Sequence, residues 1–206
     1  MKTAIKLLAV FVLMLATFSQ HTTASAGGIQ KSKAWVAYAQ FSSVDPSGCI
    51  LTTVDIFGED LVVGSGPGSA SSDTQLTIYQ YDACTDTVLL DAHGSASLAD
   101  RDFRVSGNLD SATLNATASI YDYVSHSYFD VFVDLTWTGT GSLNHYNDQS
   151  RWHSPGCNSI NHFISAFRYE EASGIVSDGE TDFAPAPSVS AYIYSNKIGD
   201  VSAGCH

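Results

Sequence analysis

The chain has 206 residues, of which 21 are acidic and nine are basic. Its hydrophobic content of 44% and aromatic content of 11% exclude a disordered acidic tail and allow one domain with a sizeable core. Lys2 and Lys6 lie in an N-terminal leader that has no acid, so the rest carries seven bases and 21 acids, a net charge of 7 − 21 = −14. This balance argues against nucleic acid or an anionic membrane as partner, because both need a basic face.

The first 26 residues have the pattern of a cleaved signal peptide. Lys2 and Lys6 make the first residues positively charged, and an apolar run extends from Leu7 to Phe18. Ala24-Ser25-Ala26 then has the pattern of an A-x-A cleavage site. The apolar run is shorter than the roughly 20 residues that span a bilayer. We therefore expect cleavage after residue 26, a secreted or extracytoplasmic location, and no transmembrane segment after cleavage.

All four cysteines follow this leader, and an even number in an exported chain predicts two disulfides. We expect the pairs Cys49–Cys84 and Cys157–Cys205, because shorter loops close at lower entropic cost. The alternative, cysteines as metal ligands, lacks a C-x-x-C spacing and needs a reducing compartment.

Beyond a flexible start at 27–33, residues 34–206 are expected to form a single all-β domain. Alternation of period two dominates, and no helical stripe of useful length occurs. The first strands are expected around 35–41 and 49–57, followed by a flexible loop at 64–73 and a strand at 75–82 whose inner face is undetermined.

The clearest alternation runs through 88–98, 103–109, 112–123 and 128–138, and it predicts an antiparallel meander of four strands. Turn lengths predict three registers, namely Leu98 opposite Phe103, Leu109 opposite Ala112, and Tyr123 opposite Tyr128. The inner face is rich in Gly and Ala, which leaves room for large aromatic side chains from elsewhere in the chain. The candidates for this bulk are Trp35, Phe41, Trp137, Phe163 and Phe167.

Two further strands are expected at 160–169 and 189–194, with a long polar loop at 141–158 and a connection at 172–188. The meander then closes as a disulfide-stapled β-sandwich or small barrel of roughly eight to ten antiparallel strands. Sandwich and barrel remain open alternatives, because the choice depends on how the first and last strands close the sheet.

The loop at 141–158 is the candidate ligand-binding site. A flat aromatic ring covers one face of a sugar or small ligand, while carboxylate, imidazole and guanidinium groups fix its polar atoms. The alternative is a structural loop whose tryptophan packs beneath it. The candidate residues are His145, Tyr146, Asp148, Arg151, Trp152 and His153.

Other chemistry has weaker support in the sequence. The spacing of His145, His153 and His162 matches no compact metal-ligand motif, so we expect neither a metal nor a cofactor. No G-x-S-x-G motif occurs, and the adjacent Glu170 and Glu171 point to opposite faces of a strand.

The sequence thus predicts an exported binding module for a small molecule, a glycan or a surface protein. One alternative is an extracytoplasmic hydrolase or isomerase with His153 or His145 as general base and Asp148 as its orienting partner. Another alternative is a structural protein of the cell surface that self-associates through exposed strand edges.

Overall fold

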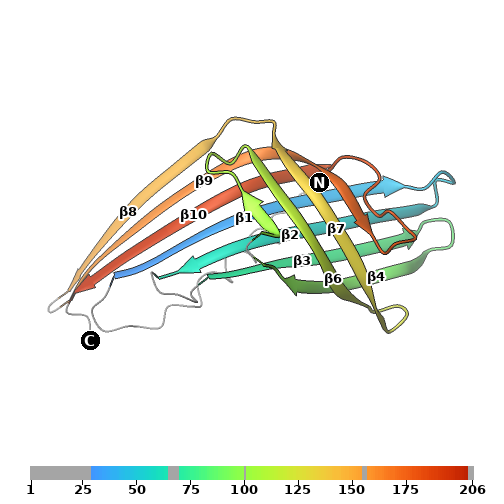
Figure 1. The fold of residues 1–206 in the computed structure, drawn as a ribbon, viewed down its shortest axis with the longest axis horizontal. Coiled ribbons are helices and arrows are strands. Elements are labelled where there is room, and N and C mark those ends of the chain that lie inside the picture. The colour runs from blue at the N-terminus through green and yellow to red at the C-terminus, as the bar shows by residue number, and fades with distance from the viewer. Residues whose placement is uncertain (1–28, 65–69, 100, 155–156, 204–206) are drawn as a thin grey trace.

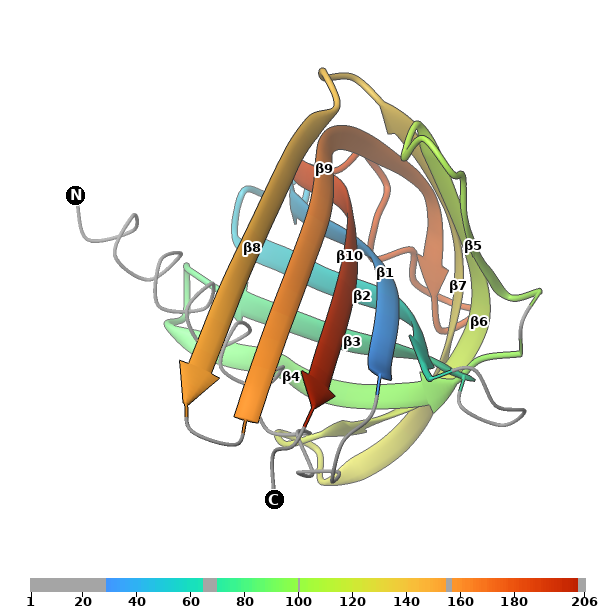
Figure 2. The ribbon, with the colours of Figure 1, turned by 90° about the vertical axis from the view of Figure 1, so that its left-hand side faces the viewer.

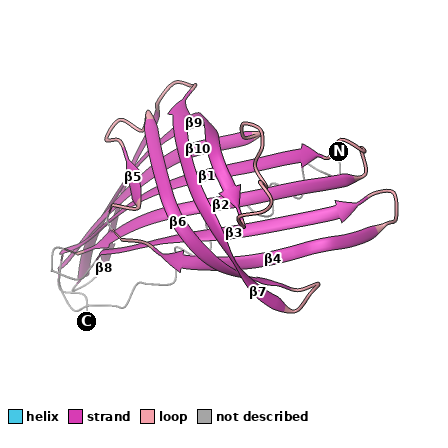
Figure 3. Ribbon diagram, turned by 45° about the vertical axis from the view of Figure 1, so that its right-hand side comes forward, coloured by secondary structure: helices cyan, strands magenta, loops and turns pink. Residues whose placement is uncertain are grey.

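The computed structural model describes residues 29–64, 70–99, 101–154 and 157–203 (Figure 1). The predicted signal peptide lies outside these residues. Within the described ranges every regular element is a β-strand (Figure 3), and no helix long and apolar enough to cross a membrane is found. The ten strands are β1 (Ile29–Val44), β2 (Ile50–Val63), β3 (Ala70–Asp82), β4 (Thr87–Ser97), β5 (Phe103–Val105), β6 (Ser111–Asp122), β7 (Ser127–Gly139), β8 (Asn144–Ser154), β9 (Cys157–Ser177) and β10 (Ser190–Ala203).

The sheet closes on itself as a ring. Its strands follow the order β10-β1-β2-β3-β4-β6-β7-β9, and β9 pairs with β10 to complete the circle. All these pairs are antiparallel, while β5 adds only to β6 and β8 adds only to β9. The predicted all-β class is confirmed, and closure makes the fold a small barrel rather than an open sandwich.

Strand β9 belongs to both the ring and an extension beyond it. Its residues 170–177 pair with β7, whereas residues 158–167 lie between β10 and β8. Gly174 lies opposite Leu135 in the β7–β9 pair, with a positive φ of 143°, and a Cβ there would approach the Asp134 carbonyl oxygen to 2.0 Å. Glycine is therefore required at this position. We call the extension, formed by residues 29–35, 144–154, 157–167 and 195–203, the wing; it occupies the left side of Figure 1.

The core fills the ring and follows the predicted alternation. Trp137 and Phe41 are among the largest fully buried side chains, and they share the core with the small residues Ala112, Ala116 and Ala118. Gly94 illustrates the tight packing, because a Cβ there would lie 2.6 Å from the Ile120 side chain. The prediction was wrong for Phe163 and Phe167, which lie on the outer face of the sheet.

The predicted meander is correct in the β5–β6 and β6–β7 pairs, but wrong in the β4–β5 hairpin and in the registers. Strand β4 pairs directly with β6, with Gly94 opposite Ile120, so no β4–β5 hairpin places Leu98 opposite Phe103. Val105 instead lies opposite Ala112, because the β5–β6 turn spans residues 106–110. Each shift moves the register by an even number of residues, so the paired inner residues keep their face, whereas Gly107 lies exposed in the turn.

A repeated turn explains the β6–β7 register. The Asp82 and Asp122 side chains each accept backbone N–H bonds from the residues two and three positions later. Each turn ends on a residue in the left-handed region, Asp86 or His126. This Asx geometry closes the turn at 123–126, so Asp122 lies opposite Ser127 and Tyr121 opposite Tyr128. The motif Tyr-Asp-x-x-Ser/Thr-x-Ser/Thr at 81–87 and 121–127 is its sequence signal.

One of the two predicted disulfides is confirmed. Cys49 and Cys84 join the β1–β2 turn to the β3–β4 turn across 35 positions of sequence. The Cys157–Cys205 prediction cannot be compared, because Cys205 lies outside the described residues. A disulfide of this kind is typical of an oxidising environment.

Several predicted boundaries shift in the structure. Residues 29–33, expected in the flexible start, are paired on both sides from Ser32 onward. Strand β3 begins at Ala70, inside the predicted loop, and β9 continues to Ser177, inside the predicted connection. Polar and small residues fill these segments, and they join the sheet because neighbouring strands satisfy their backbone groups.

Candidate functional site

The polar segment that carries the candidate site is a strand rather than a loop. Residues 144–154 form β8, which pairs along its length with β9 and has no second neighbour among the described strands. The prediction of a loop was wrong because polar side chains are tolerated on an edge strand whose two faces are wet.

Strand alternation divides the six candidate residues between the two faces of the wing. Tyr146, Asp148 and Trp152 share the outer face, opposite Ser165, Phe163 and Ser159 of β9. The other three share the face that continues the interior of the ring; these are His145, Arg151 and His153. No single ligand-contacting cluster contains all six.

Along β8 the outer face of the wing is aromatic and exposed. Trp152 and Tyr146 expose 60% and 57% of their surface, and Asp148 lies between them on the same side of β8. Tyr146 packs edge-on against Phe163, with ring centroids 6.0 Å apart. These rings form a flat apolar strip with one carboxylate along β8 and β9.

The aromatic strip continues across the ring strands. Phe167 lies 4.7 Å from Tyr169 and 5.4 Å from Tyr192, measured between ring centroids, and Tyr192 lies 5.1 Å from Tyr38. The Tyr38 hydroxyl donates to Asp55 at 2.5 Å. Burial and this hydrogen bond raise the pKa of Tyr38. Sequence reasoning missed this strip because its members come from β8, β9, β10 and β1, and only the register brings them to one face.

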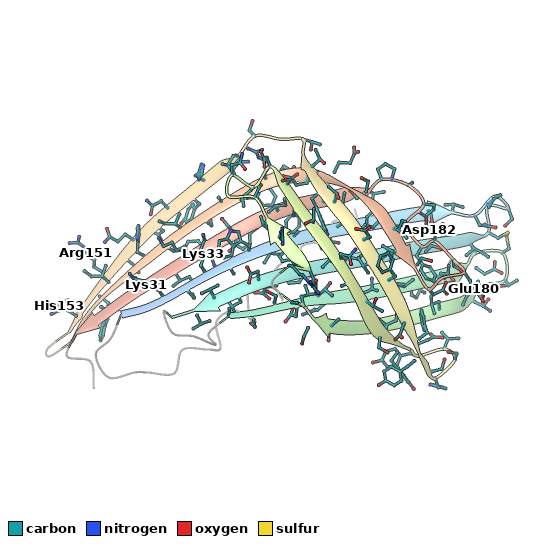
Figure 4. All side chains as sticks on the ribbon, in the orientation of Figure 1. Lys31, Lys33, Arg151, His153, Glu180 and Asp182 are labelled. Carbon is teal, nitrogen blue, oxygen red and sulfur yellow. A yellow bond between two sulfur atoms is a disulfide. The ribbon has the colours of Figure 1, made fainter. Side chains whose placement is uncertain are left out.

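The inner face of the wing carries cations. Lys33 of β1 lies directly opposite Lys197 of β10, and its ammonium stands 3.7 Å from the centroid of the Trp35 ring. Partial burial lowers the pKa of Lys33, repulsion from Lys197 lowers it further, and Asp60 opposes the change. Figure 4 shows Lys31, Lys33 and Arg151 on the wing, far from Glu180 and Asp182 at the other end of the molecule.

The three histidines considered as metal ligands share this inner face but lie apart. His145 and His153 are eight residues apart on one strand, which is about 27 Å. The His162 ring bonds Asn147 at 3.0 Å, and the His153 ring bonds Asn158. Among the described residues the one group within ligating distance is Cys49, Asp82 and Cys84, and its two sulfurs are joined to each other.

The geometry separates the catalytic residues of the enzyme hypothesis. Asp148 points to the outer face of β8, whereas His145 and His153 point to the inner face. A carboxylate on the opposite side of a strand cannot orient either imidazole, so this proposed base and partner do not form a dyad.

A buried carboxyl marks the junction between ring and wing. Glu170 is 7% exposed on the inner face of β9, and neither of its carboxyl oxygens has a hydrogen-bond partner in the described structure. Burial raises the pKa of Glu170 to about 7, Arg168 opposes this rise, and Asp110 adds to it.

We expect Glu170→Gln to stabilise the protein at pH 8 and to have little effect at pH 5. The folded pKa lies above the ordinary value of 4.5, so the folded state binds the proton more tightly. Stability from this group is therefore present at low pH and is lost as pH rises from about 4.5 to about 7. Urea unfolding at both pH values measures the change.

The matched control is Glu171→Gln, because Glu171 is the exposed neighbour on the same strand. It should leave the pH dependence as in the wild type. The stability of Glu170→Gln should still depend on pH, since burial, Asp73 and Asp60 raise the pKa of Glu59 to about 7. If both variants changed the free energy of unfolding equally at pH 8, the carboxyl of Glu170 would be solvated rather than buried.

Comparisons with known proteins assign no family. No family model and no curated protein matches the chain. A solved structure from Nitrosomonas europaea, of a protein provisionally assigned as AttH, is similar over 92% of this chain, with 11% sequence identity and a TM-score of 0.32. The chain covers 56% of that protein. A likeness at this level assigns no role to the chain.

Proposed function

We propose that the protein is an exported binding module whose outer aromatic strip on the wing binds carbohydrate. The observation that carries the proposal is the set of exposed rings on one face of two adjacent strands. Trp152, Tyr146 and Tyr169 expose 60%, 57% and 62% of their surface. Large exposed apolar groups gathered on one face are costly in water and are typical of binding surfaces.

Carbohydrate is the ligand class that best suits this strip. An aromatic ring stacks on the apolar face of a sugar, and polar groups beside it fix the hydroxyls. Asp148 and Ser150 lie between Tyr146 and Trp152 on the same face of β8. The alternation along one strand therefore places ring, carboxylate, hydroxyl and ring in sequence. The extended strip suits a chain of sugars more than a single small molecule.

Export is supported by the predicted signal peptide and by the Cys49–Cys84 disulfide, which is stable in an oxidising compartment. A binding module displayed outside the cytoplasm meets polysaccharides directly. The two features are therefore consistent with the proposed ligand.

We expect Trp152→Ala to weaken glycan binding by about tenfold or more, because stacking of one aromatic ring contributes on the order of 1–2 kcal/mol. A glycan array with the mature, oxidised protein identifies the ligand, and titration calorimetry then measures the affinity. The matched control is Tyr128→Ala, which removes another exposed ring, 73% accessible, from β7.

Loss of affinity in Trp152→Ala with retention in Tyr128→Ala supports the proposed site. Equal affinities in the two variants would remove Trp152 from the site. A blank array for the wild type would count against carbohydrate as the ligand.

A further inference from the structure

The bases of this acidic chain gather on a few strands. Of the seven bases that follow the predicted leader, five belong to β1, β8, β9 and β10; these are Lys31, Lys33, Arg151, Arg168 and Lys197. The registers place all five on the inner face of the sheet. Acids outnumber bases threefold after the leader, so a face that carries five bases departs from the average charge of the chain.

Four of these cations form no close ion pair in the described structure. Within the described residues, no carboxylate lies within 4.0 Å of Lys31, Lys33, Arg151 or Lys197. Lys33 and Lys197 are also direct register partners, and like charges in that position destabilise a sheet. Asp60 acts on Lys33 at longer range, and its carboxylate accepts a hydrogen bond from Ser72. Lys33 is offset only by its contact with the Trp35 ring and by the field of Asp60, and none of the four cations forms an ion pair within the described part of the chain, which points to an external anion.

The surface between the cations carries neutral polar groups. Along the wing, Lys33 and Lys197 lie in one register row with Ile164 and Asn147, and Lys31 lies in the next row with His162 and Gln149. Amide and imidazole groups can both donate hydrogen bonds to hydroxyls and accept hydrogen bonds from them. Trp35 adds an aromatic ring to the same face. Such a mixture suits a ligand with both hydroxyls and negative charges.

We propose that the inner face of the wing binds a short anionic glycan that carries carboxylate or sulfate groups, with Lys33 and Lys197 at the centre of the site. From β1 to β8 the face crosses three strand spacings, about 14 Å, which accommodates several charged groups. This site is separate from the outer strip, because it lies on the opposite side of the same strands.

The shape of the sheet favours a soluble chain over a flat surface. The sheet curls from β8 through β9, β10 and β1 into β2, β3 and β4, so the cationic face lies on the concave side (Figure 2). A planar bilayer reaches a concave face poorly. The net charge of −14 also repels long polyanions at a distance, whereas a short chain meets mainly the local field of the lysines.

The test is calorimetric titration of the oxidised mature protein with a sulfated and a carboxylated oligosaccharide, beside a neutral oligosaccharide of equal length. We expect binding of the charged chains at about 0.05 M salt and marked weakening at about 0.5 M. Lys33→Gln/Lys197→Gln should lower the affinity at least about tenfold, because each charged group loses its partner. Lys33→Arg/Lys197→Arg should retain binding.

The matched control is Arg101→Gln/Arg104→Gln, which changes the net charge equally at two exposed bases near β5. The affinity of this arginine variant for the charged chains should stay within about twofold of the wild type. Removal of Lys33 and Lys197 relieves repulsion, so the variant should fold, and its thermal midpoint verifies this. Trp152→Ala should bind the charged chains as the wild type does, which separates this proposal from the proposed function.

Three outcomes would overturn the proposal. The first is no binding of either charged chain by the wild type at low salt. The second is an equal loss in the lysine pair and the arginine pair, which indicates a general charge effect. The third is a stronger response to anionic lipid vesicles or to a short single-stranded oligonucleotide, which assigns the face to another class of ligand.

Discussion

Trp137→Ala should lower the free energy of unfolding by about 3–5 kcal/mol, the largest effect expected from a single core substitution. Trp137 is fully buried on β7, directly opposite Ala112 of β6 and Ala172 of β9. Two alanines leave the space that the indole fills. The indole N–H also donates to the Tyr38 carbonyl oxygen at 2.8 Å, which links β7 to β1 across the interior.

Urea unfolding followed by far-UV circular dichroism measures this loss. Trp137→Phe is the informative companion, because it keeps an aromatic ring and removes the N–H. Its cost should be smaller, about 1–2 kcal/mol, since it loses one hydrogen bond and little apolar area. If Trp137→Ala cost no more than Trp137→Phe, the indole would not be the centre of the core.

Removal of the Cys49–Cys84 disulfide should lower the free energy of unfolding by roughly 2–4 kcal/mol. The bond closes a chain segment of 35 positions, so the unfolded chain gains conformational freedom when the bond is absent. Cys49→Ala/Cys84→Ala should therefore unfold at lower urea concentration than the oxidised wild type. The backbone bond from Ala83 to the Cys49 carbonyl, 2.9 Å long, should keep the two turns adjacent in the folded variant.

The same double variant also tests whether ligand binding by the wing depends on the disulfide-linked turns. The disulfide joins turns at the end of β1 and β3 remote from residues 29–35. Ligand affinity at either face of the wing should therefore remain within about twofold of the wild type at temperatures where both are folded. A large loss of affinity without unfolding would mean that the turn end controls the geometry of the wing.

The sequence by itself determined the alternation of faces. Inner residues such as Ala112, Leu135 and Trp137 could be assigned because a period of two is a local property of each strand. The Cys49–Cys84 pair was also predictable, since it closes a short loop. The all-β class follows from the same local pattern, repeated along the chain.

The register could be predicted only to within an even shift. The side chains of Asp82 and Asp122 set where their turns close, and the β4–β6 pairing bypasses the three residues of β5. Such choices depend on hydrogen bonds to specific turn amides and on competition among distant strands. Alternation alone does not encode either of them.

Only the tertiary structure decided the two candidate sites. The six candidate residues at 145–153 have the sequence pattern of one loop cluster, and strand formation divides them between two faces. Lys33 and Lys197 are separated by most of the chain and become neighbours only when β10 pairs with β1. Local periodicity specifies which side of its own strand a residue takes. The closure of the ring specifies which residues from distant strands share that side.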